Sequence, residues 1–258
     1  MTTAIRAVHG LALAALLFTV TPARAQTTAS VPAQPAEPVM PSFVSLFSNL
    51  PADVRRLPTL TNGIWLGGTG ALALAVHSKD RPITQQASES FGLETFLDTG
   101  EPMGSGFVQG GAALGTYLVG RFANRPDIAV VGADLTRAQI ITAALTHAVK
   151  VAADRQRPDG RRYSFPSGHS AATFATATVL ERHFGWKVGV PAYAMATYVA
   201  GSRLSENRHY LSDVIFGAGI GIVSGRAVTV GHGAQRFAVS PTVVPGGFGL
   251  SFARIGAQ

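Results

Sequence analysis

The sequence predicts a bundle of α-helices, and three features lead to that prediction. Six mainly apolar segments follow one another, each long enough for several helical turns. Glycine and proline residues separate these segments, as expected for helix ends and turns. The chain also holds 29 glycines and many alanines, whose small side chains let helix axes approach closely. The expected helices are residues 63–77, 105–122, 136–153, 169–184, 188–203 and 207–226.

Residues 1–25 have the three parts of a secretory signal peptide. Arg6 gives a basic start, an apolar run follows at 11–20, and Ala-Arg-Ala at 23–25 is a small-x-small cleavage site. The apolar run is shorter than the ~18 residues that a membrane span requires. We therefore expect cleavage after residue 25 and export to the periplasm.

The segments on either side of the helices have a different character. Residues 26–57 are expected to form a Pro-rich linker that ends in a short amphipathic piece, because Pro, Ala and Thr recur without helical or strand periodicity. The main helical domain is expected over 58–230. In the tail at 231–258, two short apolar runs flank Pro245-Gly246-Gly247, which indicates a possible β-hairpin.

The composition limits the chemistry that the chain can perform. There is no cysteine, so disulfides and thiolate sites are excluded, and no His/Asp/Glu cluster has persuasive metal-ligand spacing. We expect neither a metal nor another cofactor. The formal net charge is +7, and the basic residues concentrate at 150–162 and 203–208 without interleaved aromatic residues. This pattern favours a small phosphate ligand over nucleic acid.

Two charge-free apolar stretches, 57–78 and 102–120, compete with a fully soluble domain. If the first three helices crossed a membrane after a cleaved signal peptide, Lys150 and its neighbours would lie on the cytoplasmic side. That side is not the compartment to which a signal peptide directs a protein, so a soluble periplasmic domain is favoured. The alternative is an inner-membrane protein with a periplasmic active site, and a membrane surface remains a possible partner. The oligomeric state is not predicted.

The first of three polar clusters consists of Lys150 and Arg157, followed by Pro158. An arginine offers a planar fork to two phosphate oxygens, whereas a lysine acts as a point charge. Taken alone, these residues are more typical of a basic helix end that stabilises the helix dipole.

The second cluster, Pro166-Ser167-Gly168-His169, precedes an expected helix. Gly168 permits close backbone approach, and the free N–H groups of the helix start attract an anion. Ser167 is a candidate N-cap that could also donate to phosphate. His169 is a candidate general acid, although a lone histidine here is more often a surface residue.

The third cluster comprises Ser202-Arg203, His209 and Asp213. Because Asp213 follows His209 by four positions, the two are expected on one helix face, where the carboxylate accepts the Nδ1 proton. The Nε2 atom would then be free as a nucleophile. An isolated pair of this kind is more often a helix-stabilising ion pair.

Together, the three clusters match the patterns K-x6-RP, PSGH and SR-x5-H-x3-D at every defined position. With them, the chain resembles the superfamily of type 2 phosphatidic acid phosphatases and vanadium haloperoxidases, which shares its site with bacterial class A acid phosphatases. The resemblance implies an all-α domain with a six-helix catalytic core. It also implies a metal-independent hydrolase of phosphomonoesters, or of lipid phosphates and diphosphates.

The resemblance also implies a role for each matching residue. His209 is the nucleophile that forms a phosphohistidine, Asp213 orients it, and His169 protonates the leaving oxygen. Two other functions remain open, a vanadium-dependent haloperoxidase and a non-enzymatic module that contacts other envelope components. The residues that would hold the phosphoryl oxygens are Lys150, Arg157, Ser167, Gly168 and Arg203.

Overall fold

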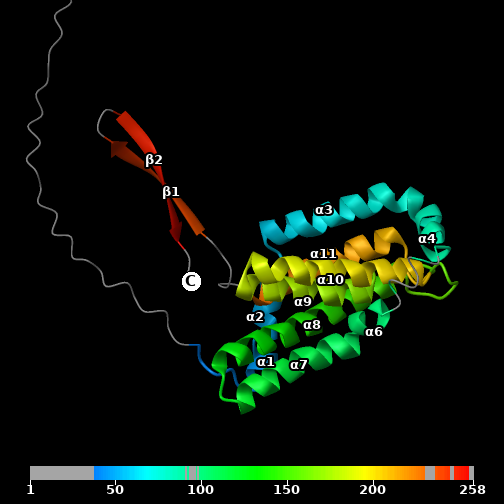
Figure 1. Ribbon diagram of the computed structural model, residues 1–258, viewed down its shortest axis with the longest axis horizontal. Coiled ribbons are helices and arrows are strands. Elements are labelled where there is room, and N and C mark those ends of the chain that lie inside the picture. The colour runs from blue at the N-terminus through cyan, green and yellow to red at the C-terminus, as the bar shows by residue number, and fades with distance from the viewer. Residues whose placement is uncertain are drawn as a thin grey trace, which may run out of the picture. The chain divides into compact units, whose positions relative to one another are not determined.

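The computed structural model describes residues 38–90, 92, 97, 99–229, 236–244 and 247–255. The predicted signal peptide and the first part of the predicted linker lie outside these residues. The described chain is mainly helical, which confirms the predicted all-α class (Figure 1). The helices are α1 (Ser45–Ser48), α2 (Leu50–Arg55), α3 (Leu60–Val76), α4 (Asp80–Ser88), α6 (Gly100–Gly104), α7 (Gly106–Phe122), α8 (Pro126–Ala153), α9 (Gly168–Phe184), α10 (Trp186–Ser205) and α11 (Leu211–Val228), with a 3₁₀ turn at His77–Lys79.

The tail contains the only strands among the described residues, β1 (Arg236–Val244) and β2 (Gly247–Ile255). They pair antiparallel, with Val244 opposite Gly247 and Arg236 opposite Ile255. This is the segment for which the sequence indicates a possible hairpin.

The six long helices coincide with the six expected ones, but their first residues differ, most of all in α8. Helix α8 begins at Pro126, ten residues before the expected start. Proline is favoured in the first turn, where its missing N–H would have no partner in any case. Helix α10 begins at Trp186, so Pro191 lies in the second turn and removes the bond that its N–H would make to the Lys187 carbonyl.

Helix α9 lies at the centre of the bundle and packs against α8, α10 and α11. Helix α7 packs on α8, and α3 packs on α11 (Figure 1). The inward face of α9 is built from Ala171, Ala175 and Val179, which are all fully buried. A Cβ added at Gly221 of α11 would lie 2.2 Å from the Ala171 carbonyl oxygen, so these two helices touch through backbone. Small residues therefore set the close spacing of the bundle.

Residues 38–57 were expected in the linker, but they pack on the bundle instead. The Arg137 guanidinium of α8 donates to Asp53 of α2 (2.7 Å) and to Asp134 (2.6 Å), and all three side chains are buried. The Tyr117 hydroxyl donates to the Pro41 carbonyl (3.0 Å). A buried charge needs a partner, so these contacts fix the N-terminal segment to α7 and α8.

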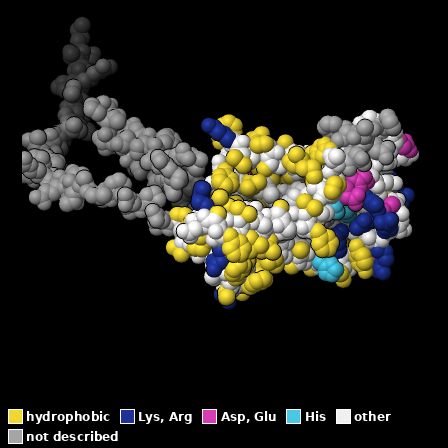
Figure 2. Space-filling view, turned by 60° about the horizontal axis from the view of Figure 1, so that its bottom comes forward, with side chains coloured by type: hydrophobic (Ala, Val, Ile, Leu, Met, Phe, Trp, Pro, Cys, Tyr) yellow, Lys and Arg dark blue, Asp and Glu magenta, His cyan; other side chains and the backbone are white. Residues whose placement is uncertain are grey.

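The outward faces of α3, α7 and α10 are apolar, and Figure 2 shows hydrophobic side chains over much of the visible face. Two other helices, α8 and α11, are long and apolar enough to cross a membrane, and 56% and 72% of their apolar windows are buried inside the protein. Exposed apolar surface therefore lies on the peripheral helices. Its most exposed members, between 62% and 95% accessible, include Leu60, Leu74, Phe107, Phe122, Trp186 and Val190.

We expect the ion pair between Asp53 and Arg137 to contribute to stability. Asp53→Asn removes one partner of a buried pair, which costs about 3 kcal/mol and should lower Tm by roughly 6–12 °C. Asp127→Asn is the matched control, because it breaks a pair with Arg125 in which both side chains are more than half exposed. Thermal unfolding of both variants tests this. An equal effect of the two substitutions would contradict it.

Candidate active site

The three polar clusters meet at one end of the bundle. The first lies at the end of α8 and in the loop that follows, and the second lies at the start of α9. The third extends from the end of α10 to the start of α11. Figure 2 shows charged and histidine side chains gathered at this end. They surround a cavity of about 160 Å³, here called the phosphate cavity, which is lined by Glu101, Arg157, Arg161, His169, Arg203, Arg208 and His209.

Lys150 and Gly168 lie beside the phosphate cavity and not in its wall. They line a neighbouring groove of about 290 Å³, and His169 lines both spaces. The Lys150 ammonium donates to the Tyr163 carbonyl (2.7 Å), which fixes the loop between α8 and α9. A Cβ added at Gly168 would meet only side-chain carbons at 3.8 and 4.0 Å. The protein's own packing therefore does not require glycine here, and the backbone stays open to a ligand.

Ser167 is the N-cap of α9, and its hydroxyl is fully buried. Its Oγ accepts hydrogen bonds from the backbone N–H and the hydroxyl of Ser170 (3.4 and 3.1 Å). Its own N–H donates to the Asp213 carbonyl (2.9 Å), which joins the starts of α9 and α11. A Cβ at Gly217 would lie 2.5 Å from the Ser167 carbonyl oxygen, so only glycine allows this approach.

His209 and Asp213 do meet, but not on one helix face as expected. His209 precedes α11, Tyr210 is the N-cap, and Asp213 is the third residue of the helix. The distance from His209 Nδ1 to Asp213 Oδ2 is 3.5 Å, and both side chains are buried. Asp213 Oδ2 also accepts the Tyr210 N–H (2.8 Å) and the Ser164 hydroxyl. The carboxylate therefore caps the helix and faces the histidine at the same time.

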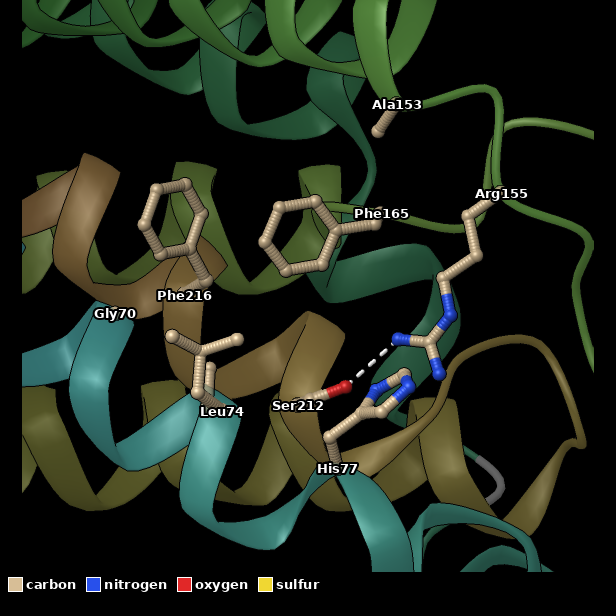
Figure 3. A pocket seen from close by; sticks show the side chains of 9 residues that line it. Gly70, Leu74, His77, Ala153, Arg155, Phe165, Ser212 and Phe216 are labelled. Carbon is tan, nitrogen blue, oxygen red and sulfur yellow. Dashed lines mark hydrogen bonds between the residues drawn. The ribbon is translucent and has the colours of Figure 1, made fainter.

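Arg155 holds the other oxygen of this carboxylate, and the sequence analysis missed it. Its guanidinium donates to Asp213 Oδ1 (2.6 Å), the Ser212 hydroxyl (2.7 Å) and Asp80 Oδ2 (2.8 Å). Figure 3 shows Arg155 reaching Ser212 across the end of an apolar cleft. Asp80, the first residue of α4, also accepts the Ser212 N–H (2.9 Å). The network therefore extends from the motif aspartate to a helix outside all three motifs.

The cavity walls carry an excess of positive charge. Burial lowers the pKa of His169 to about 4, and the neighbouring Arg203, His209, Arg157 and Lys150 act in the same direction. Burial also lowers the pKa of His209, against the effect of the Asp213 carboxylate. Both imidazoles are therefore neutral near pH 7 in the empty site. Such a site favours an anion.

Two acidic residues outside the motifs pair with Arg203, which is itself buried. Glu206 follows it by one helical turn and contacts its Nη2. Glu101 of the short helix α6 lies 3.7 Å from its Nη1 and is the one acid in the cavity wall among the described residues. Gly100 and Gly104 let α6 come this close, because a Cβ would lie 2.5 Å from Ser202 Oγ and 2.3 Å from Val199 Cγ1.

Comparison with known proteins identifies part of the chain. Residues 159–237 match the PAP2 superfamily. A lipid A 1-phosphatase of Porphyromonas gingivalis is 40% identical over 85 residues, which are 31% of this chain and 19% of that protein. The chain therefore matches about a fifth of the length of this relative.

Two solved structures are also similar. One is LpxE of Aquifex aeolicus, with 20% identity, a TM-score of 0.49, and coverage of 58% of this chain and 93% of that one. The other is a transmembrane PAP2-type phosphatidylglycerolphosphate phosphatase of Bacillus subtilis, with 21% identity, a TM-score of 0.44, and coverage of 72% and 94%.

The matched residues contain the second and third clusters, whereas Lys150 and Arg157 precede them. The resemblance that the motifs indicate is thus confirmed, and residues 159–237 of this chain carry the sequence of the PAP2 superfamily.

Proposed function

We propose that this protein is a phosphohydrolase that transfers the phosphoryl group of a phosphomonoester or lipid phosphate to His209 and then to water. The observation that carries this proposal is the phosphate cavity, where two histidines and several arginines converge in front of a fixed carboxylate. The name of the Porphyromonas gingivalis relative supports a phosphorylated lipid as substrate. Among the described residues, no group of three or more His, Asp or Glu side chains could hold a metal ion.

The cationic side chains and the start of α9 bind the phosphoryl group. Arg157 and Arg203 line the cavity, and Lys150 approaches it from the neighbouring groove. The N–H groups at Ser167 and Gly168 belong to a helix N-terminus, which attracts negative charge. These groups stabilise the charge that spreads over the phosphoryl oxygens in the transition state.

The chemistry then proceeds in two displacements. His209 Nε2 attacks phosphorus, the bond to the leaving oxygen breaks, and His169 gives that oxygen a proton. Asp213 keeps the Nδ1 proton of His209 in place, so that Nε2 carries the lone pair. Water next attacks the phosphohistidine and passes its proton to the now neutral His169. The P–N bond breaks, and phosphate leaves.

The low pKa of His169 fits this role once the substrate is considered. The cations that lower the pKa are those that a phosphoryl dianion neutralises. A bound dianion therefore raises the pKa of His169, and the acid acquires its proton together with the substrate.

We also infer that the protein is membrane-associated. The apolar outward faces of α3, α7 and α10 would be costly in water, whereas the charged residues of the site gather at one end of the bundle. This arrangement supports the inner-membrane alternative over the soluble domain, with the site at the level of the lipid headgroups. Export to the periplasm is proposed from the signal peptide pattern alone.

Sulfate binding should take up a proton at His169. Sulfate is a dianion throughout the range from about pH 5 to pH 8, so its own titration does not interfere. Because the protonated imidazole adds a positive charge, affinity should rise as the pH falls from 8 to 5. Calorimetry in buffers of different ionisation enthalpy measures the uptake. His169→Asn should weaken the pH dependence, and equal profiles for the two proteins would count against His169.

Replacing the two histidines should have different effects on an activated aryl phosphate, assayed with a chelator present. His209→Ala removes the nucleophile, so no phosphoenzyme should form. His169→Ala should still release a burst of phenolate, because this leaving group needs little protonation. The variant should then accumulate an acid-labile, base-stable phosphohistidine, since no group remains to activate water. Asp213→Asn should slow the first step.

Quenched-flow labelling of the three variants decides the roles of these residues. A labelled phosphoryl group on the His209→Ala protein would contradict the assigned role of His209. A burst of phenolate from His169→Ala without a labelled protein would contradict the phosphohistidine intermediate. A requirement for an added divalent ion in the wild-type protein would contradict the metal-independent mechanism.

Membrane association is tested by fractionating the expressed full-length chain. We expect the protein in the membrane fraction after high-salt and carbonate washes, and its release by mild detergent, because apolar contacts do not respond to salt. Folded protein in the detergent-free soluble fraction would restore the soluble periplasmic interpretation.

A further inference from the structure

A second cavity lies next to the phosphate cavity, on the other side of Arg157. Its volume is about 460 Å³, within the range of about 300–1,000 Å³ that is typical of small-molecule sites. Helix α4 forms one wall, and the loops 154–167 and 206–210 form the others. We call it the α4 pocket. Arg157 lines both cavities, so a ligand held by its phosphate could extend past Arg157 into the α4 pocket.

The α4 pocket is lined mainly by neutral hydrogen-bonding groups. Gln85, Gln156 and Asn207 contribute amides, and Thr84 and Tyr210 contribute hydroxyls. The Gln85 amide donates to Glu89 (2.7 Å) and the Gln156 amide donates to the Gly160 carbonyl (3.1 Å). An alkyl chain would offer no partner to the remaining hydrogen-bonding groups, above all the Thr84 hydroxyl, which is costly. A second phosphate would need cations of its own, but Glu89 offsets Arg81 and the remaining cation, Arg157, is shared with the phosphate cavity. The lining therefore matches a ligand that carries several hydroxyl groups.

Among the residues of this wall, Thr84 gives the strongest indication of a ligand. The residue is 1% exposed, and its Oγ1 has no hydrogen-bond partner among the described residues. A buried hydroxyl without a partner is destabilising, so a ligand that hydrogen-bonds to it gains affinity.

The wall that presents Thr84 is held in place by the catalytic network. Asp80, one helical turn before Thr84, accepts hydrogen bonds from Arg155 (2.8 Å) and from the Ser212 N–H (2.9 Å). Arg155 and Ser212 also contact each other, and Arg155 holds Asp213. The position of α4 is thereby fixed relative to the nucleophile, as a substrate subsite requires.

We propose that the α4 pocket binds a sugar or similar polyhydroxylated part of the substrate's leaving group. The proposal rests on the proposed phosphohydrolase function and adds a recognition site on a helix outside the three motifs. It assigns Thr84 and Gln85 to specificity and leaves the transfer of the phosphoryl group to the motif residues.

The test compares glucose 1-phosphate with para-nitrophenyl phosphate in the full-length protein. The double variant Thr84→Val, Gln85→Leu keeps side-chain volume but removes hydrogen bonds, so kcat/KM for glucose 1-phosphate should fall about tenfold. The value for para-nitrophenyl phosphate should stay within about twofold. Thr116→Val on α7 is the matched control, because its hydroxyl bonds only to the Ala112 carbonyl far from the pocket (2.8 Å). Tm should be unchanged in the double variant.

The possible outcomes separate the two proposals. Equal losses on both substrates, or no loss on either, would overturn the sugar subsite and leave the phosphohydrolase standing. A selective loss on inorganic pyrophosphate instead would mean that the pocket takes a second phosphate, which also overturns it. Calorimetric binding to the His209→Ala protein, which forms no phosphoenzyme, gives the same comparison without turnover. This protein should bind glucose 1-phosphate more tightly than phenyl phosphate, and adding the double substitution should abolish this difference.

Discussion

The buried carboxylate of Asp213 is the constraint on which the rest of the site depends. A fully buried charge is tolerated only with good partners, and this one has Arg155, Ser164 and the Tyr210 N–H. Two of these partners lie in the loop that follows α8. The hydrogen bonds that stabilise this charge therefore hold the loop after α8 against the start of α11. Through Arg155 they also position α4. His209 faces the same carboxylate, so the stability of the fold and the orientation of the proposed nucleophile have one origin.

Much of this could be predicted from the sequence, because the relevant patterns are local. Apolar segments between glycines and prolines located all six long helices, and the joint match to three motif patterns selected His169, His209 and Arg203, which line one cavity. The errors were local as well. Pro126 was treated as a break although it begins a helix, and His209 was placed inside a helix that starts two residues later.

The residues that were missed depend on contacts between distant parts of the chain. Arg155 meets Asp80 and Asp213 across 75 and 58 positions, and no periodicity marks such a pair. Glu101 reaches Arg203 only because two glycines let α6 approach, which a sequence does not reveal. The exposed apolar faces were anticipated only in part. The apolar stretches 57–78 and 102–120 cover α3 and most of α7, but the apolar face of α10 was not identified. The length of an apolar run does not tell which of its residues face other helices, and the longer α8 is half-buried.

All the chemistry lies at one end of the bundle, and this leaves the opposite end with connections only. The turn at 123–125 joins α7 to α8, and the single residue Gly185 joins α9 to α10. Neither contains a residue of the three clusters, and exposed turns are where insertions are best tolerated. A fluorophore or an affinity handle placed in the turn at 123–125 would leave the reacting groups in register. The fold thereby separates the part of the chain that must stay fixed from the part that can be redesigned.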